Sequence, residues 1–228
     1  MENLSYLYKD PLHHADMIDF IVRQHAPVLY AAPDGVVAGD DDGFYLVSCE
    51  TQACADRIIP LLKSIDELVV HQPFLLDRIP GVVPRITCHQ AVYQKTEKIP
   101  YTLPEDYAIR PLDASHLPFV YAHYDVVHDM EYLSWRIENG MYGVFFGDEI
   151  VGFIGTHGEG SMGMLEILPA HRRHGLAFCL EAHLINHLLE EGRTPYCQIE
   201  IHNDASLALQ HRLGLTVSDR ELTWMQRR

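Results

Sequence analysis

The sequence predicts an α/β protein whose sheet contains strands of both directions. After residue 105, segments with strand-like and helix-like periodicity alternate along the chain, which is typical of α/β folds. The clearest pair of strands lies in YGVFFGDEIVGFIGT, where two apolar runs flank Gly147-Asp148-Glu149 as in a β-hairpin. Hairpin strands are antiparallel, whereas strands joined through a helix can run parallel, so we expect a mixed sheet.

Length and composition indicate an ordinary globular protein. The 228 residues are 47% hydrophobic and 10% aromatic, and the formal net charge is -15. Such a charge repels nucleic acid and anionic membranes, so neither is an expected partner. Five cysteines without a CxxC motif predict free thiols in a reducing compartment. The N-terminus lacks a signal-peptide pattern and no apolar run approaches ~20 residues, so we expect a cytoplasmic protein.

The segment KTEKIPYTLPEDY, residues 95–107, divides the chain into two halves. It is polar, contains two prolines and interrupts the apolar periodicity, as linkers do. We therefore expect an N-terminal α/β half over residues 1–100 and a second domain over residues 105–228.

The N-terminal half is expected to contain helices and strands of ordinary length. Helix-like patterns cover residues 16–25 and 53–64, GVVAGDDDGFYLVSC predicts two strands around an acidic turn, and ITCHQAVYQ predicts another strand.

The second half has a more regular order of elements. Asp113 is a plausible N-cap for a helix to about residue 123, and Gly192 a C-cap for a long helix. The expected strands are 107–111, the hairpin 142–156, 161–168, 196–201 and a final pair up to Trp224; the expected helices are 113–123, 131–139, 173–191 and 204–213.

The stretch LPAHRRHGLA, residues 168–177, predicts an anion-binding loop. Pro169 ends a strand, and the free N–H groups of the next helix point outward at the positive end of its dipole. Gly175 and Ala177 are small enough for phosphates to approach the backbone. Three side chains add charge or a hydrogen-bond donor: Arg172, Arg173 and His174. A solvated basic helix start is the alternative that the arginines by themselves leave open.

The spacing Arg172-x-x-Gly175-x-Ala177 after ILP resembles the acyl-CoA pyrophosphate loop of the GCN5-related N-acetyltransferase (GNAT) superfamily. NDASLALQHRLGL resembles the closing motif of that superfamily, and the order of elements over residues 105–228 also matches. More narrowly, GSMGMLEILPAHRRHG and the closing Trp224 resemble the FR47-like and glycine N-acyltransferase branch.

This resemblance implies a GNAT fold, with a mixed, mostly antiparallel sheet and helices on both faces. It also implies that the smaller N-terminal α/β half, residues 1–100, is a degenerate copy of the fold. A regulatory or dimer-forming role of this half, and hence a homodimer, is left open.

The resemblance further implies that acetyl-CoA or another acyl-CoA is the co-substrate. Its pantetheine arm would pair with the backbone of Leu165 and Ile167, with Asn203 and Ser206 beside it. The pyrophosphate would lie on the loop residues Arg172, Arg173, His174, Gly175, Leu176 and Ala177. No metal is expected: His183 and His187 are spaced i, i+4 as metal ligands can be, but no third ligand accompanies them.

The catalytic positions depart from the family pattern. Many members place a Glu base eleven residues before the first Arg of the loop and a Tyr acid seven residues after the Asn; this chain has Ser161 and Gln210 there. Gln210 can only donate a hydrogen bond to the thioester sulfur. The base is therefore expected among Glu159, Glu166 and Glu200. Glu166 has the opposite strand parity to Ser161, so it faces the cleft only if a bulge intervenes, and its alternative role is to pair with a cation.

These features predict an acyl-CoA-dependent N-acyltransferase. It would move an acyl group, acetyl first of all, to the amine of a small molecule or amino acid by direct attack, with the acyl oxygen held by a strand N–H group. The alternative is a catalytically weak acyl-CoA-binding sensor, which the missing Glu and Tyr favour.

Overall fold

The computed structural model describes residues 4–39 and 42–228, so Asp40 and Asp41 of the expected acidic turn lie outside the described residues. The chain forms two compact units. The first comprises the described residues up to Val92 together with Gln198–His211 and Leu215–Arg228, and the second comprises Tyr93–Cys197 and Arg212–Gly214. The units therefore differ from a single division of the chain within the linker.

The strands of the first unit follow the order β1-β2-β3-β4-β11-β5. All neighbours in this series are antiparallel except β3 and β4, which are parallel. The strands are β1 (Val28–Ala32), β2 (Gly35–Gly39), β3 (Phe44–Cys49), β4 (Glu67–Val70), β5 (Val82–Val92) and β11 (Thr216–Arg227). The two strands expected around the acidic turn are confirmed as β2 and β3.

Helices cover both faces of this sheet. On β3 the side chains alternate: Tyr45 and Val47 pack in a cluster with Ile58 of α2 (Gln52–Ile58), whereas Leu46 packs in a cluster with Phe20 of α1 (Ala15–Val22). This alternation follows from the two-residue period of a strand. Short 3-10 helices complete the unit at Leu4–Lys9, Ile59–Leu61 and Pro73–Leu75.

The expected final strand pair is wrong. Residues Thr216–Arg227 form one strand of 12 residues, β11, which pairs with both β4 and β5. The polar run from Ser218 to Arg220 resembles a turn, but its residues form an irregularity within the strand: the backbone N–H of Arg220 donates to Ser218 Oγ at 3.1 Å, and the register against β5 shifts between Val217 and Glu221.

The strands of the second unit follow the order β10-β9-β8-β7-β6. The hairpin is confirmed as β7 and β8, and every neighbouring pair is antiparallel except β9 and β10. Residues Tyr196 and Cys197 of β10 belong to this unit. The strands are β6 (Tyr107–Pro111), β7 (Tyr142–Phe146), β8 (Glu149–Thr156), β9 (Met162–Ile167) and β10 (Tyr196–Glu200).

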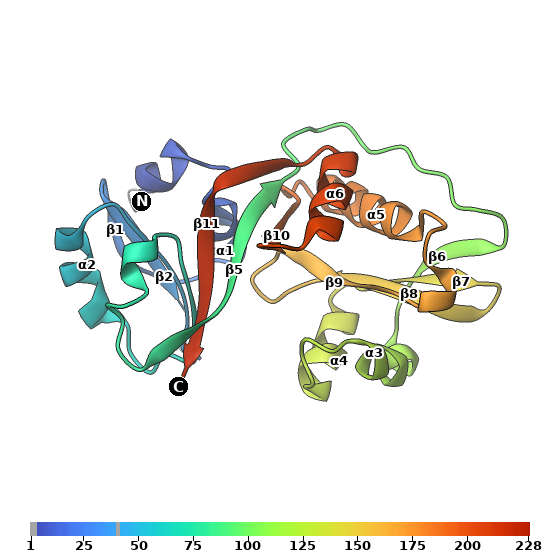
Figure 1. Ribbon diagram of the computed structural model, residues 1–228, viewed down its shortest axis with the longest axis horizontal. Helices are drawn as coiled ribbons and strands as arrows, with labels where there is room; N and C mark the ends of the chain where they lie inside the picture. The colour runs from blue at the N-terminus through green and yellow to red at the C-terminus, as the bar shows by residue number, and fades with distance from the viewer. Residues whose placement is uncertain (1–3, 40–41) are drawn as a thin grey trace. The chain divides into compact units, whose positions relative to one another are not determined.

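Helices α3 (Leu117–His123) and α4 (Met130–Glu138) lie on one side of this sheet, and α5 (Leu176–Glu190) on the other (Figure 1). Val120 and Leu133 pack against Phe153 of β8. Asp113 caps a 3-10 turn, Ala114–His116, which leads into α3. The last helix is α6 (Asp204–Leu213), as expected.

Each unit contains a series of antiparallel strands. The last strand of the series is followed by a helix and then by a strand that pairs with it in parallel. In the first unit this element is β3-α2-β4, and in the second it is β9-α5-β10. The expected fold class, a mixed, mostly antiparallel sheet with helices, is therefore confirmed. No helix in the described part of the chain has the length and apolarity needed to cross a membrane.

Candidate active site

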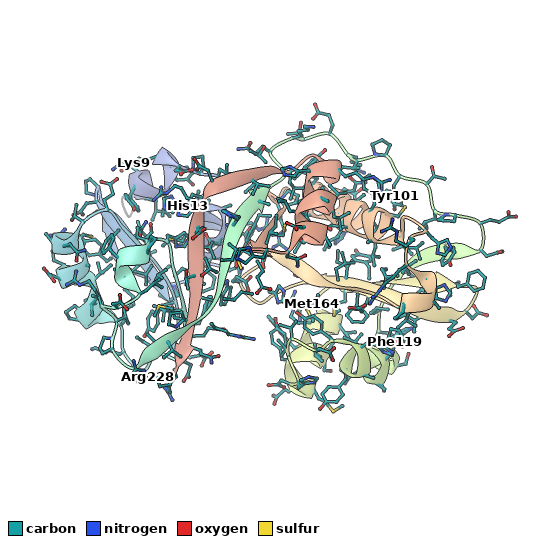
Figure 2. All side chains as sticks on the ribbon, in the orientation of Figure 1. Lys9, His13, Tyr101, Phe119, Met164 and Arg228 are labelled. Carbon is teal, nitrogen blue, oxygen red and sulfur yellow. The ribbon has the colours of Figure 1, made fainter. Side chains whose placement is uncertain are left out.

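Strand β9 contains a bulge at its centre. Against β8, Phe153 lies opposite Glu166 and Gly155 opposite Gly163, so that Met164 and Leu165 together face one residue of β8. Met164 has φ 52°, in the left-handed region that a non-glycine residue rarely adopts, and its side chain lies with Phe119 in the cluster against α3 and α4 (Figure 2). The sequence allowed Glu166 to face the cleft only if a bulge lay between it and Ser161, and such a bulge is present. It disrupts the ladder of hydrogen bonds at this point.

Strand β10 pairs with β9 in parallel at one position, where Cys197 lies opposite Met162. Leu165, one of the two residues expected to pair with the pantetheine arm, lies within the bulge. The carbonyl of the other, Ile167, already accepts a hydrogen bond from Arg172 Nε at 2.8 Å.

Arg172 turns back onto β9. In addition to its bond with Ile167, its Nη2 donates to Glu166 Oε1 at 2.8 Å. Glu166 thus has the alternative role, as the partner of a cation, and Arg172 anchors the loop to the strand. By contrast, within residues 4–39 and 42–228 Arg173 has no ion-pair or hydrogen-bond partner, so its charge is available to a ligand.

Helix α5 begins at Leu176, three residues later than expected, because the loop uses left-handed backbone. Arg173 has φ 68° and the N-cap Gly175 has φ 77°. No side chain caps the first turn, so its N–H groups are left for water or a ligand. A Cβ atom at Gly175 would meet no atom within 4 Å, so the approach to these groups is open.

The remaining loop residues differ in their availability. Leu176 is buried in the core, whereas Ala177 is half-buried. His174 is exposed, and its Nδ1 donates to the carbonyl of His171 at 3.1 Å. A neutral His174 in this position therefore has no second N–H group to offer a phosphate.

A pocket of about 370 Å³ lies at this end of α5. The guanidinium of Arg212 lies 4.4 Å from the centroid of the Phe178 ring, a cation–π arrangement that holds another positive charge at the pocket. Arg212 is not among the residues predicted from the sequence, since no spacing signal connects the end of α6 to the loop. The lining residues are Pro100, Tyr101, Thr102, His174, Gly175, Phe178, Cys179 and Arg212.

The linker forms one wall of this pocket because it is bound along α5. The side-chain amide of Asn186 accepts from the Ile99 N–H at 2.7 Å and donates to the Ile99 carbonyl at 2.9 Å. Tyr101 lies beside α5 (Figure 2), with its hydroxyl 2.7 Å from His183 Nδ1. His183 is therefore engaged by the linker, and the described residues contain no group of three metal-ligating side chains.

Cys179 also lines the pocket, but its thiol is not an activated nucleophile. Its Sγ donates to the Thr102 carbonyl at 3.4 Å, and burial raises the pKa of the thiol. A protonated thiol does not attack a thioester at neutral pH.

Of the residues predicted for catalysis, Glu159 and Ser161 are brought together. Both are buried, and the Ser161 hydroxyl donates to Glu159 Oε1. Their contact lies in the turn between β8 and β9, directly before the bulged strand.

Four other residues predicted from the sequence belong to the first unit: Glu200, Asn203, Ser206 and Gln210. Asn203 caps α6, since its Oδ1 accepts from the Ser206 N–H at 3.0 Å. Gln210 is buried, whereas Glu200 is exposed at the end of β10.

Residues 141–225 match the family model described as FR47-like protein. This segment is therefore similar to the FR47-like family. The match includes the hairpin, the bulged β9, the loop and α5. No curated protein sequence matches the chain.

Solved structures have the same fold over most of the chain. A Drosophila protein of 20% identity superposes with a TM-score of 0.71, over 85% of this chain and 74% of its own. A GCN5-related N-acetyltransferase from Kribbella flavida, 11% identical, has a TM-score of 0.64 and covers 93% of both chains. A tandem GNAT protein from the clavulanic acid biosynthesis pathway, 13% identical, has a TM-score of 0.51 over 85% of this chain and 79% of its own.

Proposed function

We propose that the protein is an N-acyltransferase that moves an acyl group from acyl-CoA to the amine of a small molecule or amino acid. Acetyl is the first candidate for the acyl group. The observation that carries the proposal is the continuity of the site. The bulged β9 leads through an open, glycine-capped turn directly into α5, so one segment offers both unpaired strand backbone and a helix N-terminus.

The residues present fit an acyl-CoA. The uncapped N–H groups of α5, with Arg173 beside them, would bind the pyrophosphate, and Arg212 adds charge at the adjoining pocket. Leu165 would pair with the pantetheine arm along β9. The co-substrate supplies a thioester; the chain orients it and holds its carbonyl oxygen by a backbone N–H group.

The N-terminal half supports a tandem arrangement. The shared strand–helix–parallel strand element of the two units favours a degenerate GNAT copy over residues 1–100, followed by an acyltransferase domain over residues 105–228. All five cysteines are free, which fits a reducing, cytoplasmic location.

The activity is tested by turnover. We expect the purified protein to release CoA thiol from acetyl-CoA when supplied with a panel of amines and amino acids, and to form one acetylated product, detected by mass spectrometry. A protein that binds acetyl-CoA but releases no thiol above the hydrolysis background with any amine would instead be a sensor.

Binding of CoA is expected to weaken as ionic strength rises from about 0.01 M to about 1 M, because the Debye length falls from ~30 Å to ~3 Å. Arg173→Gln should flatten this dependence more than Arg172→Gln, since Glu166 already balances the charge of Arg172. Calorimetric titration with CoA at several salt concentrations measures both slopes. Equal slopes for Arg173→Gln and the wild type would contradict the role given to Arg173.

A further inference from the structure

The turn between β8 and β9 encloses a carboxylate and a hydroxyl. Glu159 is 6% exposed and Ser161 is 3% exposed, and the hydroxyl donates to the carboxylate. The backbone of the turn is held on both sides: the N–H of His157 donates to the Ser161 carbonyl at 2.8 Å, and the Tyr196 hydroxyl of β10 donates to the Glu159 carbonyl at 2.7 Å. The pair is thus fixed in position by two strands.

A positively charged side chain, Arg136, interacts with this carboxylate. Arg136 of α4 is 5% exposed, and its Nη2 donates to the Thr156 hydroxyl at the end of β8. Burial lowers the pKa values of Arg136 and His157, whereas the charge of Glu159 acts to raise both. A buried carboxylate is costly unless charges and hydrogen bonds compensate it, and here both are present.

The pair lies at the start of the strand on which the proposed transfer takes place. Ser161 precedes Met162, the position at which β9 pairs with β10, and the bulge begins at Met164. Three residues of extended chain span at most ~10 Å. The backbone of the bulge therefore lies within ~10 Å of Ser161, and Ser161 is the candidate side chain nearest to it along the chain before the bulge.

We infer that Glu159 accepts the proton of the acceptor amine through the hydroxyl of Ser161. This inference rests on the proposed N-acyltransferase function. The hydroxyl hydrogen of Ser161 is committed to Glu159, so its oxygen lone pairs can accept an N–H of the incoming ammonium group. Ser161 takes that proton while passing its own to Glu159.

The remaining chemistry balances without another reactant. The neutral amine attacks the carbonyl carbon, the C–N bond forms, the C–S bond breaks, and CoA leaves as the thiolate. The second amine proton goes to the thiolate or to solvent, and Glu159 returns its proton to solvent. Glu166 is not used for this purpose, because it is paired with Arg172 in the loop.

The test is the pH profile of kcat/KM for an amine acceptor in the wild type, Glu159→Gln and Ser161→Ala. We expect Glu159→Gln to lose ~100-fold or more near neutral pH. The deficit of both variants should shrink as pH approaches the pKa of the amine, where the acceptor is already deprotonated and needs no base. Ser161→Thr, which keeps a hydroxyl, should recover activity relative to Ser161→Ala.

Two further variants distinguish this relay from a general effect of removing a carboxylate. Glu138→Gln, on the exposed face of α4, is a matched control that should leave the profile unchanged. Glu166→Gln should keep the acid limb of the profile, because Glu166 is paired with Arg172. Titration with CoA reports whether each variant is folded; if Glu159→Gln is not, Ser161→Ala carries the test because it keeps the carboxylate. A deficit that is constant across pH, or a wild-type profile in Ser161→Ala, would overturn the relay. A wild type that acylates no amine would instead overturn the proposed function.

Discussion

The free energy of unfolding is expected to fall by about 3 kcal/mol or more between pH 7 and pH 4. The cause is a cluster of three histidines in the first unit, His13, His14 and His71, all at most 2% exposed. Their ring centroids lie 5.1 to 5.4 Å apart. His13, one of the three residues, is labelled in Figure 2.

The hydrogen bonds of the cluster identify His71 as a charged ring. His71 Nδ1 lies 3.1 Å from the Val47 carbonyl and its Nε2 lies 3.0 Å from Asp16 Oδ1. Because both partners only accept, both nitrogens of His71 donate, and the ring is an imidazolium paired with the buried Asp16. His14 Nδ1 donates to the Leu7 carbonyl. Because burial lowers the pKa of His14 to about 3, this ring is neutral at pH 7, and its Nε2 accepts from the Ser48 hydroxyl at 2.9 Å.

Protonating a second ring here is unfavourable. Burial, with the charge of His71 as a further cause, lowers the pKa of His13 to about 4 and that of His14 to about 3. Both values lie below that of an unfolded histidine, so between about pH 6.5 and pH 4 the unfolded chain binds more protons than the folded one. The stability that the neutral rings contribute is therefore present above about pH 6.5 and is lost on acidification. Asp16 acts in the same direction at lower pH, since its pKa is also lowered.

Urea unfolding at a series of pH values measures this loss. His14→Gln should flatten the pH dependence, whereas His211→Gln, at an exposed position of the same unit, should leave it unchanged. A wild-type protein equally stable at pH 7 and pH 4.5 would contradict the protonation states assigned to the cluster.

Gly175→Val is expected to lower the affinity for CoA at least tenfold, or by ~1.4 kcal/mol. The residue has φ 77°, and a β-branched side chain in left-handed backbone is strained by roughly 1–2 kcal/mol. The strain would move the first-turn N–H groups, and the side chain would fill the open space that a phosphate needs. Calorimetric titration with CoA measures the effect.

Gly81→Val is the matched control for this substitution. Gly81 has φ 81° and a Cβ there would also meet no atom within 4 Å, but it belongs to the first unit and is not part of the loop. It should cost comparable stability and leave CoA affinity unchanged. If the two variants bind CoA equally well, the glycine-capped turn is not the pyrophosphate site.

Local patterns in the sequence determined much of the chain after the linker. The hairpin, the strand over Tyr107–Pro111 and the helix over Asp204–Leu213 follow from apolar periodicity, caps and turn residues that act within a few positions of one another. The spacing of Arg172, Gly175 and Ala177 likewise identified the turn before α5, because backbone conformation at such a turn depends on the residues within it.

Contacts between distant segments could not be derived in this way. The bulge in β9 depends on its register with β8, which strand parity alone does not reveal. The run Ser218-Asp219-Arg220 forms part of one strand because β5 pairs with β11 both before this run, at Val217, and after it, at Glu221. Arg212 reaches the pocket of α5 through packing on Phe178.

The candidate base and the histidine cluster show most clearly what the sequence determines and what only the tertiary structure decides. The sequence narrowed the base to three glutamates; only the tertiary structure places Glu159 against Ser161 and Glu166 against Arg172. His71 and Asp16 are 55 residues apart in the sequence, so no local pattern predicts that they pair. Protonation and hydrogen bonding depend on burial and on the nearest charges, and both of these are properties of the packed chain.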